Sequence, residues 1–261
     1  MAFISQYVHG QFSWIELTTP DLLASRRFYS ELFTWEMVDS TDELAGVYVE
    51  FQYEGHPVAG MGKMSSELRK LGTPAVWSSY INVDDVDATV EEAEALGASI
   101  EMRPMQVMAA GRMAILSDPL GARISLWQAG EHIGATQVNQ PNSLCWNELA
   151  TSNIDASIRF YRDLFDWQFR RSEDPDSVYY EILNEERENG GMIEMTEDWG
   201  AAPPLWTPYI SVFDCDETVE KAIKLGADVD MDPVDIDPGR FCVITDPLGA
   251  LLTVITLEDP E

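Results

Sequence analysis

The main shortage in this sequence is positive charge. Its 261 residues include 46 acids but only 16 lysines and arginines, which gives a formal net charge of −30. Only four of these bases are lysines. Such a surface repels the phosphates of nucleic acids and anionic membranes, so neither is an expected partner. The acid excess favours solubility, and many acids with few lysines would also suit a salt-rich cell.

Cysteines and long apolar runs are also scarce. The three cysteines, Cys145, Cys215 and Cys242, form no CxxC pair, which favours a reducing compartment over a disulfide framework. They share no spacing with a His–Asp pair, so no cysteine nucleophile is expected. No apolar run approaches the ~20 residues of a membrane span. Residues 1–12 show no secretion signal, and the sequence predicts a cytoplasmic protein.

The sequence does contain an internal duplication. The segment WIELTTPDLLASRRFYSELFTW (14–35) matches WNELATSNIDASIRFYRDLFDW (146–167). The segment WSSYINVDDVDATVEEAEALGA (77–98) matches WTPYISVFDCDETVEKAIKLGA (206–227). Matches of this length indicate two homologous halves.

A third pair of segments completes the duplication. GRMAILSDPLGA (111–122) recurs as GRFCVITDPLGA (239–250). We therefore expect one domain at 1–130 and a second at 144–261. A linker at 131–143, which contains Gly, Asn and Pro, is expected to join them.

Each half is expected to begin with a strand and a helix. In the strand at 12–19, Ile15 and Leu17 share the core face. Thr19 is expected to cap the helix and Pro20 to begin it. Hairpin turns are expected at Glu54-Gly55 and at Asn189-Gly190. The other elements expected in the first half are a strand at 77–83, a helix at 85–96, and strands near 99–106, 112–117 and 122–127. Each half then contains two β-α-β-β-β units, which indicates an α+β fold.

This order resembles the vicinal oxygen chelate superfamily, which includes glyoxalases, extradiol dioxygenases and bleomycin-binding proteins. The residues that carry the resemblance are L-x-T-x-D-x-x-x-S-x-x-FY (17–29), INVDDVDA (81–88) and DPLGA (118–122). The resemblance covers both halves, and the chain is similar to the tandem glyoxalase-like proteins of actinobacteria. The resemblance implies two glyoxalase-like domains whose mixed sheets curl into cups that bind small molecules.

The resemblance also implies a divalent metal, held by His, Gln or Glu at three cup positions. The corresponding residues here are Trp14, Ser78 and Ser125 in the first half, and Trp146, Thr207 and Thr253 in the second. None of these is a good metal ligand. His9, His56 and His132 fall elsewhere and are expected at the surface. We therefore expect no metal and no cofactor, which argues against the metal-dependent glyoxalase and dioxygenase mechanisms.

A Trp–Glu pair stands beside the missing ligands in both halves. Trp14 and Glu16 are two residues apart on one strand and so share a face, as Trp146 and Glu148 do. Glu16 and Glu148 are the candidate catalytic residues. The candidate ligand-binding residues are Trp14, Tyr80, Ser125 and Trp127 in the first cup, and Trp146, Tyr209 and Thr253 in the second. An aromatic concavity with one carboxylate is typical of a small-molecule pocket.

Structural roles for the same residues stay open. Trp14 could fill the cup as core, and Glu16 could be a buried acid neutralised by Arg112, which recurs as Arg240. Four methionines on the matching fourth strands are more typical of core than of a pocket. They are Met61, Met64, Met192 and Met195.

Three functions compete at this point. The first is a metal-free small-molecule binding protein, acting as a monomer or a homodimer. The second is a glyoxalase-like lyase or isomerase that acts on a small oxo-compound with Glu16 or Glu148 as base. The third is a protein-binding module whose cups are closed.

Overall fold

Two sheets of eight strands, one from each half, form this protein. The structure is a computed structural model that describes residues 3–42, 46–173 and 178–258. The first half comprises β1 (Phe12–Thr19), α1 (Leu22–Phe33), β2 (Glu36–Asp42), β3 (Gly46–Tyr53), β4 (His56–Lys63), α2 (Ser66–Lys70), β5 (Val76–Asn82), α3 (Val86–Ala95), β6 (Ser99–Val107), β7 (Gly111–Ser117) and β8 (Arg123–Ala129). The second comprises β9 (Ser143–Thr151), α4 (Ile154–Phe165), β10 (Gln168–Arg171), β11 (Tyr179–Asn184), β12 (Arg187–Glu194), the 3-10 turn η1 (Glu197–Trp199), β13 (Leu205–Ser211), α5 (Cys215–Lys224), β14 (Asp228–Ile236), β15 (Gly239–Thr245) and β16 (Leu251–Leu257).

The two sheets have the same topology. The order is β2-β3-β4-β1-β5-β8-β7-β6 in the first and β10-β11-β12-β9-β13-β16-β15-β14 in the second. The first strand of each half lies antiparallel to the strand that opens the second unit, as β1 does to β5. The expected α+β fold of four βαβββ units is therefore confirmed.

The sheets lie back to back through their central strands. The Ser79 hydroxyl on β5 donates a 2.6 Å hydrogen bond to the Asn147 side chain on β9 at this junction, where both residues are buried. Because side chains alternate along a strand, the neighbours Tyr80 and Trp146 point away from the junction. The aromatic faces of the two sheets therefore point to opposite sides of the molecule.

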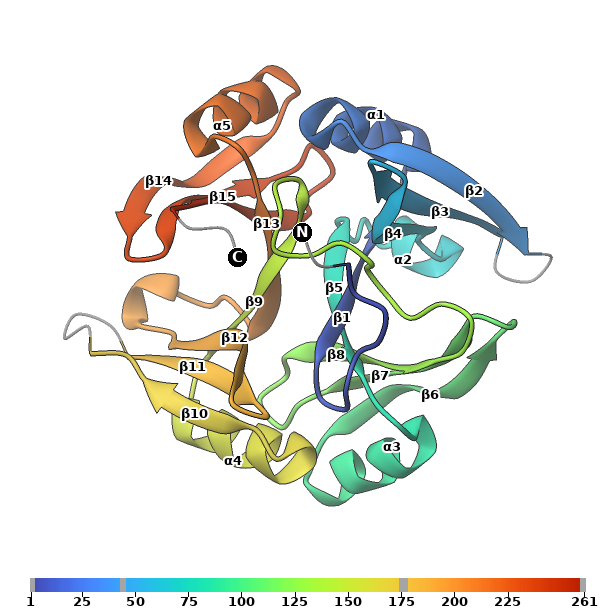
Figure 1. Ribbon diagram of the computed structural model, residues 1–261, viewed down its shortest axis with the longest axis vertical. Coiled ribbons are helices and arrows are strands. Elements are labelled where there is room, and N and C mark those ends of the chain that lie inside the picture. Colours follow the sequence, from blue (N-terminus) through green and yellow to red (C-terminus); the bar gives the residue numbers. More distant parts are fainter. Residues whose placement is uncertain (1–2, 43–45, 174–177, 259–261) are drawn as a thin grey trace.

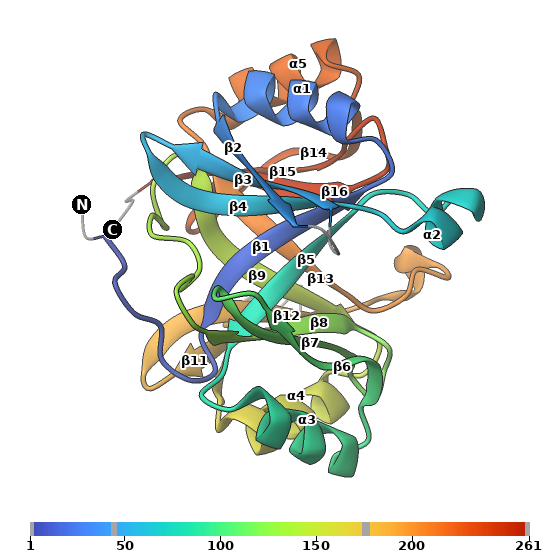
Figure 2. The same cartoon turned by 90° about the vertical axis from the view of Figure 1, so that its right-hand side faces the viewer.

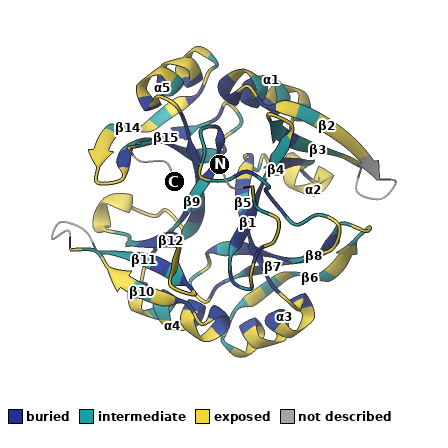
Figure 3. Ribbon diagram, viewed as in Figure 1, coloured by how far each residue is buried: buried dark blue, intermediate teal, exposed yellow. Residues whose placement is uncertain are grey.

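The hydrophobic cores are shared between the halves. Helices α1 and α5 lie together at one end of the molecule, and α3 and α4 lie at the other (Figures 1 and 2). One core joins α1, with Tyr29 and Phe33, to side chains of β15, β16 and α5. The other joins α4, with Tyr161, to side chains of α3, β7 and β8. Figure 3 shows these buried faces turned inward, under the exposed outer faces of the helices.

A buried polar bridge crosses each shared core. The Tyr29 hydroxyl donates a 2.8 Å hydrogen bond to Asp246 of the other half. The Tyr161 hydroxyl donates a 3.1 Å bond to Asp118 in the same way. These aspartates begin the two DPLGA turns, where their other oxygen accepts backbone N–H groups such as that of Ala122. The turn motif therefore also joins the halves.

Two local expectations were wrong. Helix α1 is capped by Asp21, whose carboxylate accepts the N–H groups of Leu23 and Ala24, while the Thr19 hydroxyl bonds to Ser25. The expected turn at Asn189-Gly190 lies inside β12. The hairpin turns instead at Glu185 and Glu186, which both take left-handed conformations.

Asn189 has a tertiary role in place of a turn. Its side chain accepts the N–H of Phe12 and donates to the carbonyl of Gly10, so it ties the N-terminal segment to the second half. The turn at Glu54-Gly55 and the strand at 12–19 are confirmed. The boundaries at 130 and 144 stay a prediction. No helix in the described ranges is both long and apolar enough to cross a membrane.

Candidate functional site

The first cup is built around the Glu16 carboxyl. Trp14 and Glu16 on β1 pair with Tyr80 and Ser78 on β5, so the four side chains share the outward face. The hydroxyls of Tyr80 and of Tyr48 on β3 donate hydrogen bonds to Glu16. The Trp14 indole N–H donates in turn to the Tyr48 oxygen, at 3.1 Å.

The second cup repeats this network. Trp146 Nε1 donates to the Tyr179 hydroxyl oxygen at 3.0 Å. The hydroxyls of Tyr179 and Tyr209 donate to the Glu148 carboxyl. Tyr209 pairs in register with both Trp146 and Thr253, which places the predicted residues of this cup on one face.

A glycine makes room for each network. A Cβ at Gly60 of β4 would overlap the Tyr48 hydroxyl and lie 3.0 Å from Trp14 Nε1. A Cβ at Gly191 of β12 would overlap the Tyr179 hydroxyl in the same way. The strand beside each carboxylate therefore has no side chain at the point where the tyrosine hydroxyl crosses it.

The two carboxyls differ in their electrostatic surroundings. Burial raises the pKa of Glu16, and its tyrosine partners and the charge of Arg123 partly offset that rise. Arg123 lies on β8, where it donates to Ser78 at 2.9 Å and pairs with Glu101. Burial also raises the pKa of Glu148, and only its two tyrosine partners offset it. The two DPLGA motifs are followed by Arg123 in the first half and by Leu251 in the second. The second cup therefore has a leucine at the position of the arginine.

The linker covers the first cup. Residues 130–136, which we name the strap, begin on the β6–β7 turn, where His132 N donates to the Ala110 carbonyl. The strap then crosses β1, where Ala135 N donates to Ser13, and reaches β4 at Pro57. Figure 1 shows it in light green, running from β8 toward the centre.

His132 fills the first cup from above. Its ring lies edge-on to Trp14 with centroids 4.6 Å apart, and 5.9 Å from the centroid of Trp127. Trp127 Nε1 donates to the His132 carbonyl at 2.9 Å. Burial lowers the pKa of the imidazole, with a smaller opposing effect of Glu50. Its Nε2 is buried without a hydrogen-bond partner among the described residues.

The strap closes the first cup as a small core. Trp14, Tyr80 and Trp127 are 3%, 4% and 6% exposed and cluster with Ala135. The N-terminal segment packs over the strap, because the Tyr7 hydroxyl donates to the Ala135 carbonyl at 2.6 Å. The first cup is therefore occupied by the chain itself.

The second cup is more open. Trp146 is half-buried, whereas its counterpart Trp14 is buried; Glu148 and Tyr179 are half-buried, as Glu16 and Tyr48 are in the first cup. Its wall continues through Phe241 to Val234, which is 44% exposed. Ile255 replaces Trp127, and within the described ranges no ring stacks on Trp146.

Several assignments made from sequence need correction. Arg112 does not neutralise Glu16, since it pairs with Asp87 at 2.7 Å; its counterpart Arg240 pairs with Asp216. The nearby cation is Arg123. The histidines are half-buried rather than surface residues: His9 accepts a bond from Asp84 N and His56 stacks on Phe3.

The other side chains behave as the sequence indicates. Met61 and Met192 belong to the two shared cores, and Met64 is also buried. Met195 is half-buried. The three cysteines are free thiols, and burial raises the pKa of each, which argues against a thiolate nucleophile.

The side chains of the cups do not fit the metal that the fold implies. Each network holds one carboxylate, whose oxygens accept the tyrosine hydrogen bonds, and the remaining groups are hydroxyls and indoles. In the described part of the chain, no three His, Cys, Asp or Glu side chains gather as a metal site would require.

Sequence reasoning missed four residues of these sites. Tyr48 and Tyr179 could have been found, because VYVE (47–50) recurs as VYYE (178–181). Arg123 and His132 have no counterpart in the second half and leave no repeat signal.

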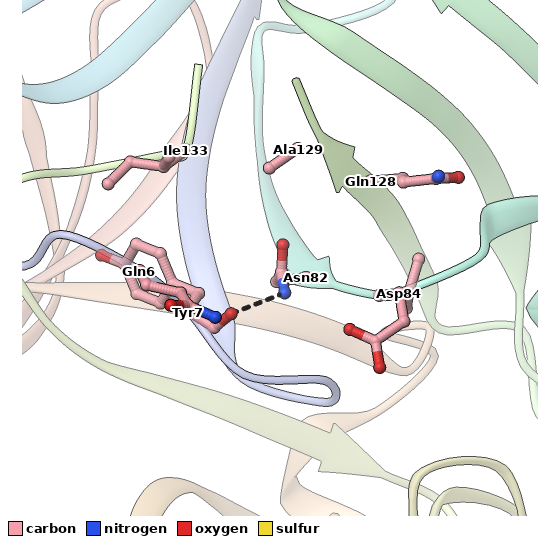
Figure 4. Close-up of a pocket in the computed structure, with 8 residues that line it drawn as sticks. Gln6, Tyr7, Asn82, Asp84, Gln128, Ala129 and Ile133 are labelled. Carbon is pink, nitrogen blue, oxygen red and sulfur yellow. Dashed lines mark hydrogen bonds between the residues drawn. The ribbon is translucent and has the colours of Figure 1, made fainter. Parts of the chain in front are cut away.

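Two surface hollows lie outside the cups. One, of about 220 Å³, lies beside the end of β5, where Asn82 donates to the Tyr7 carbonyl (Figure 4). The other, of about 300 Å³, lies between α1 and α5 and is bordered by Phe33 and Lys221. Neither includes a residue of the two tyrosine–glutamate networks.

Comparison with known proteins places both halves in one family. A sequence model of the Glyoxalase/Bleomycin resistance protein/Dioxygenase superfamily matches residues 11–126 and 140–254. "Putative glyoxylase CFP32" of Mycobacterium bovis is 37% identical, with 96% of each chain covered. "Anthracycline biosynthesis protein DauV" of a Streptomyces species is 33% identical over 98% of this chain and 96% of its own.

Solved structures agree on the fold. The Mn(II)-bound glyoxalase from Novosphingobium aromaticivorans superposes with a TM-score of 0.61 at 14% identity, covering 97% of this chain and 86% of its own. That level of identity shows the fold alone. The sequence model that matches both halves and the relatives that align over nearly the whole chain show that this chain belongs to the glyoxalase/bleomycin resistance protein/dioxygenase superfamily.

Proposed function

We propose that this protein binds a small aromatic molecule in its second cup, with no metal ion held by the cup side chains. The observation that supports this most directly is the network of Trp146, Tyr179, Tyr209 and Glu148, in which Trp146 is half-buried while its counterpart Trp14 is only 3% exposed. An aromatic concavity with a few converging polar groups is what small-molecule sites have in common.

The contrast with the first cup supports the choice of the second. The strap covers Trp14, which is buried, whereas Trp146 keeps part of its surface; Glu16 and Glu148 are both half-buried. An open second cup also argues against the protein-binding alternative, which requires closed cups.

The relatives suggest which ligands to test first. DauV is named for anthracycline biosynthesis, and anthracyclines carry flat, fused aromatic rings. Such rings suit a site lined by Trp146, Tyr209 and Phe241, because aromatic pairs stack edge-on or offset.

Binding can be tested with 1,4-dihydroxyanthraquinone as the probe. We expect saturable binding with quenching of tryptophan fluorescence and a rise in melting temperature. Trp146→Ala should weaken the probe at least about tenfold, since stacked aromatic anchors are among the strongest contacts of a site. The matched control is Trp199→Ala, because Trp199 is 38% exposed on the 3-10 turn η1. Equal binding by both variants would contradict the proposal.

Metal content is a separate test of the same proposal. Inductively coupled plasma mass spectrometry on untagged protein, purified without chelators, should find no stoichiometric divalent ion. One or two tightly bound ions per chain would contradict the metal-free part. Glu16 and Glu148 would then be the first ligands to examine.

A lyase or isomerase activity is the second candidate function. Its support is the raised pKa of Glu148, which suits a carboxylate that takes a proton from carbon and returns it to a neighbouring carbon. Glu16 shares the raised pKa but lies in the cup whose Trp14 the strap covers. The hemithioacetal of methylglyoxal and glutathione is a suitable test substrate. Turnover should be lost in Glu148→Gln with the fold intact, and unchanged turnover would exclude this mechanism.

A further inference from the structure

The two cups differ in what the chain itself supplies. In the first, the strap provides an aromatic ring, His132, which lies edge-on to Trp14. In the second, no ring in the described ranges stacks on Trp146. The strap positions would correspond to residues from 258 onward, since 130 + 128 = 258, and the structure describes only Glu258 among them.

The cups also differ in their cations. The first carries Arg123, whose charge favours the ionised form of Glu16. In the second, Leu251 takes that position, and among the described residues no cation favours the ionised form of Glu148 as Arg123 does that of Glu16. Arg170 pairs with Glu181 across the β10–β11 hairpin, so its charge is already paired within that hairpin.

In the first cup, therefore, a ring lies against the indole, and Arg123, which donates to Ser78 opposite Glu16 at 2.9 Å, places a positive charge near the carboxylate. The second holds the indole and the carboxylate alone. A partly buried carboxylate without a cation is costly, and a ligand that supplies one removes that cost. The rings of Trp146, Tyr179, Tyr209 and Phe241 add a lining that favours an ammonium group.

We propose that the second cup binds one amine-bearing aromatic molecule per chain, with its ring against Trp146 and its ammonium group at Glu148. This inference rests on the proposed function and names its ligand class. The formal charge of −30 acts in the same direction, because it raises the local concentration of cations.

Three probes that share one ring separate charge from stacking. They are 2-naphthylmethylamine, the neutral 2-naphthylmethanol and the anionic 2-naphthoate, measured by isothermal titration calorimetry. We expect one binding site per chain, with the amine at least about tenfold tighter than the alcohol and the naphthoate weakest, since hydrogen bonds to charged groups carry roughly this difference.

Two variants then assign the preference to this cup. Leu251→Arg supplies the cation of the first cup, so it should reduce the amine to the affinity of the alcohol while the alcohol still binds. Glu148→Gln should have the same effect. Glu181→Gln is the matched control, because Glu181 is already paired with Arg170, and it should keep the preference for the amine.

The outcomes separate this inference from the proposed function. Equal affinity of amine and alcohol in the wild-type protein would overturn the inference. A preference for the amine that is unchanged in Leu251→Arg would also overturn the inference. A stoichiometry of two binding sites per chain would do so as well. If the dihydroxyanthraquinone still binds in those cases, the proposed function stands. If no naphthalene probe and no anthraquinone binds, both are overturned.

Discussion

Tyr29→Phe tests whether the two halves depend on one another for stability. The Tyr29 hydroxyl lies in the shared core, donates to Asp246 at 2.8 Å and accepts from Trp77 Nε1 at 2.9 Å. The substitution removes one oxygen and no ring. It leaves a buried carboxylate oxygen and a buried indole N–H unpaired, one from each half.

The expected loss can be worked from these two bonds. A hydrogen bond to a charged group contributes about 1.5–3 kcal/mol, and a buried donor left unsatisfied costs about 1–3 kcal/mol. Together we expect about 3–5 kcal/mol, a large part of the roughly 5–15 kcal/mol by which domains are stable. Tyr161→Phe should match it, because Tyr161 bonds to Asp118 and Trp206 in the other core.

Urea unfolding followed by tryptophan fluorescence and by far-ultraviolet circular dichroism measures this loss. Both signals should shift to lower urea together, since each core contains residues of both halves. Tyr53→Phe on β3 is the control, because Tyr53 is half-buried, and it should change stability by less than about 0.5 kcal/mol. A loss below about 1 kcal/mol for Tyr29→Phe would show that these two bonds do not stabilise the contact between the halves.

Three further predictions concern the cups and the halves. Because burial raises the folded-state pKa of Glu148, the unfolded chain loses this proton first as pH rises, so ionisation lowers stability from the unfolded pKa upward. Glu148→Gln should therefore be more stable than wild type at pH 7 and equal to it below about pH 4, as measured by thermal unfolding; a constant difference would contradict this. His132→Ala should lower the free energy of unfolding by about 2–3 kcal/mol, because it empties the space between two tryptophans. His132→Phe keeps a ring there and should lower it by less than about 1 kcal/mol. Equal losses of the two variants in urea unfolding would show that the ring does not fill the cup. Residues 1–130 alone should give no folded monomer by light scattering and near-ultraviolet circular dichroism, because α1 and α3 would lack the partner halves of their cores, and a folded monomer would contradict the shared cores.

The repeat and the architecture could be predicted from the order of the residues alone. The duplicated strand–helix and DPLGA segments predicted four βαβββ units, because local periodicity and turn chemistry decide where strands and helices form. Alternation along β1 also put Ile15 and Leu17 in the core and Trp14 with Glu16 on the opposite face. These are properties of neighbours in sequence, which a reader of the chain can see.

The difference between the two cups arises from contacts between distant segments of the folded chain. Tyr48 and Tyr179 lie on β3 and β11, two strands after the strands that carry the carboxylates, and their hydroxyls reach the carboxylates over Gly60 and Gly191. The cation whose charge acts on Glu16 is Arg123 rather than Arg112, because the strand order of the sheet brings β8 beside β5 and Arg123 next to Ser78. His132 was judged a surface residue from its place in a polar linker, yet long-range hydrogen bonds draw that linker across β1 and close one cup. Contacts between segments distant in sequence leave no local pattern, and for this reason a near-symmetric sequence folds into one filled cup and one open cup.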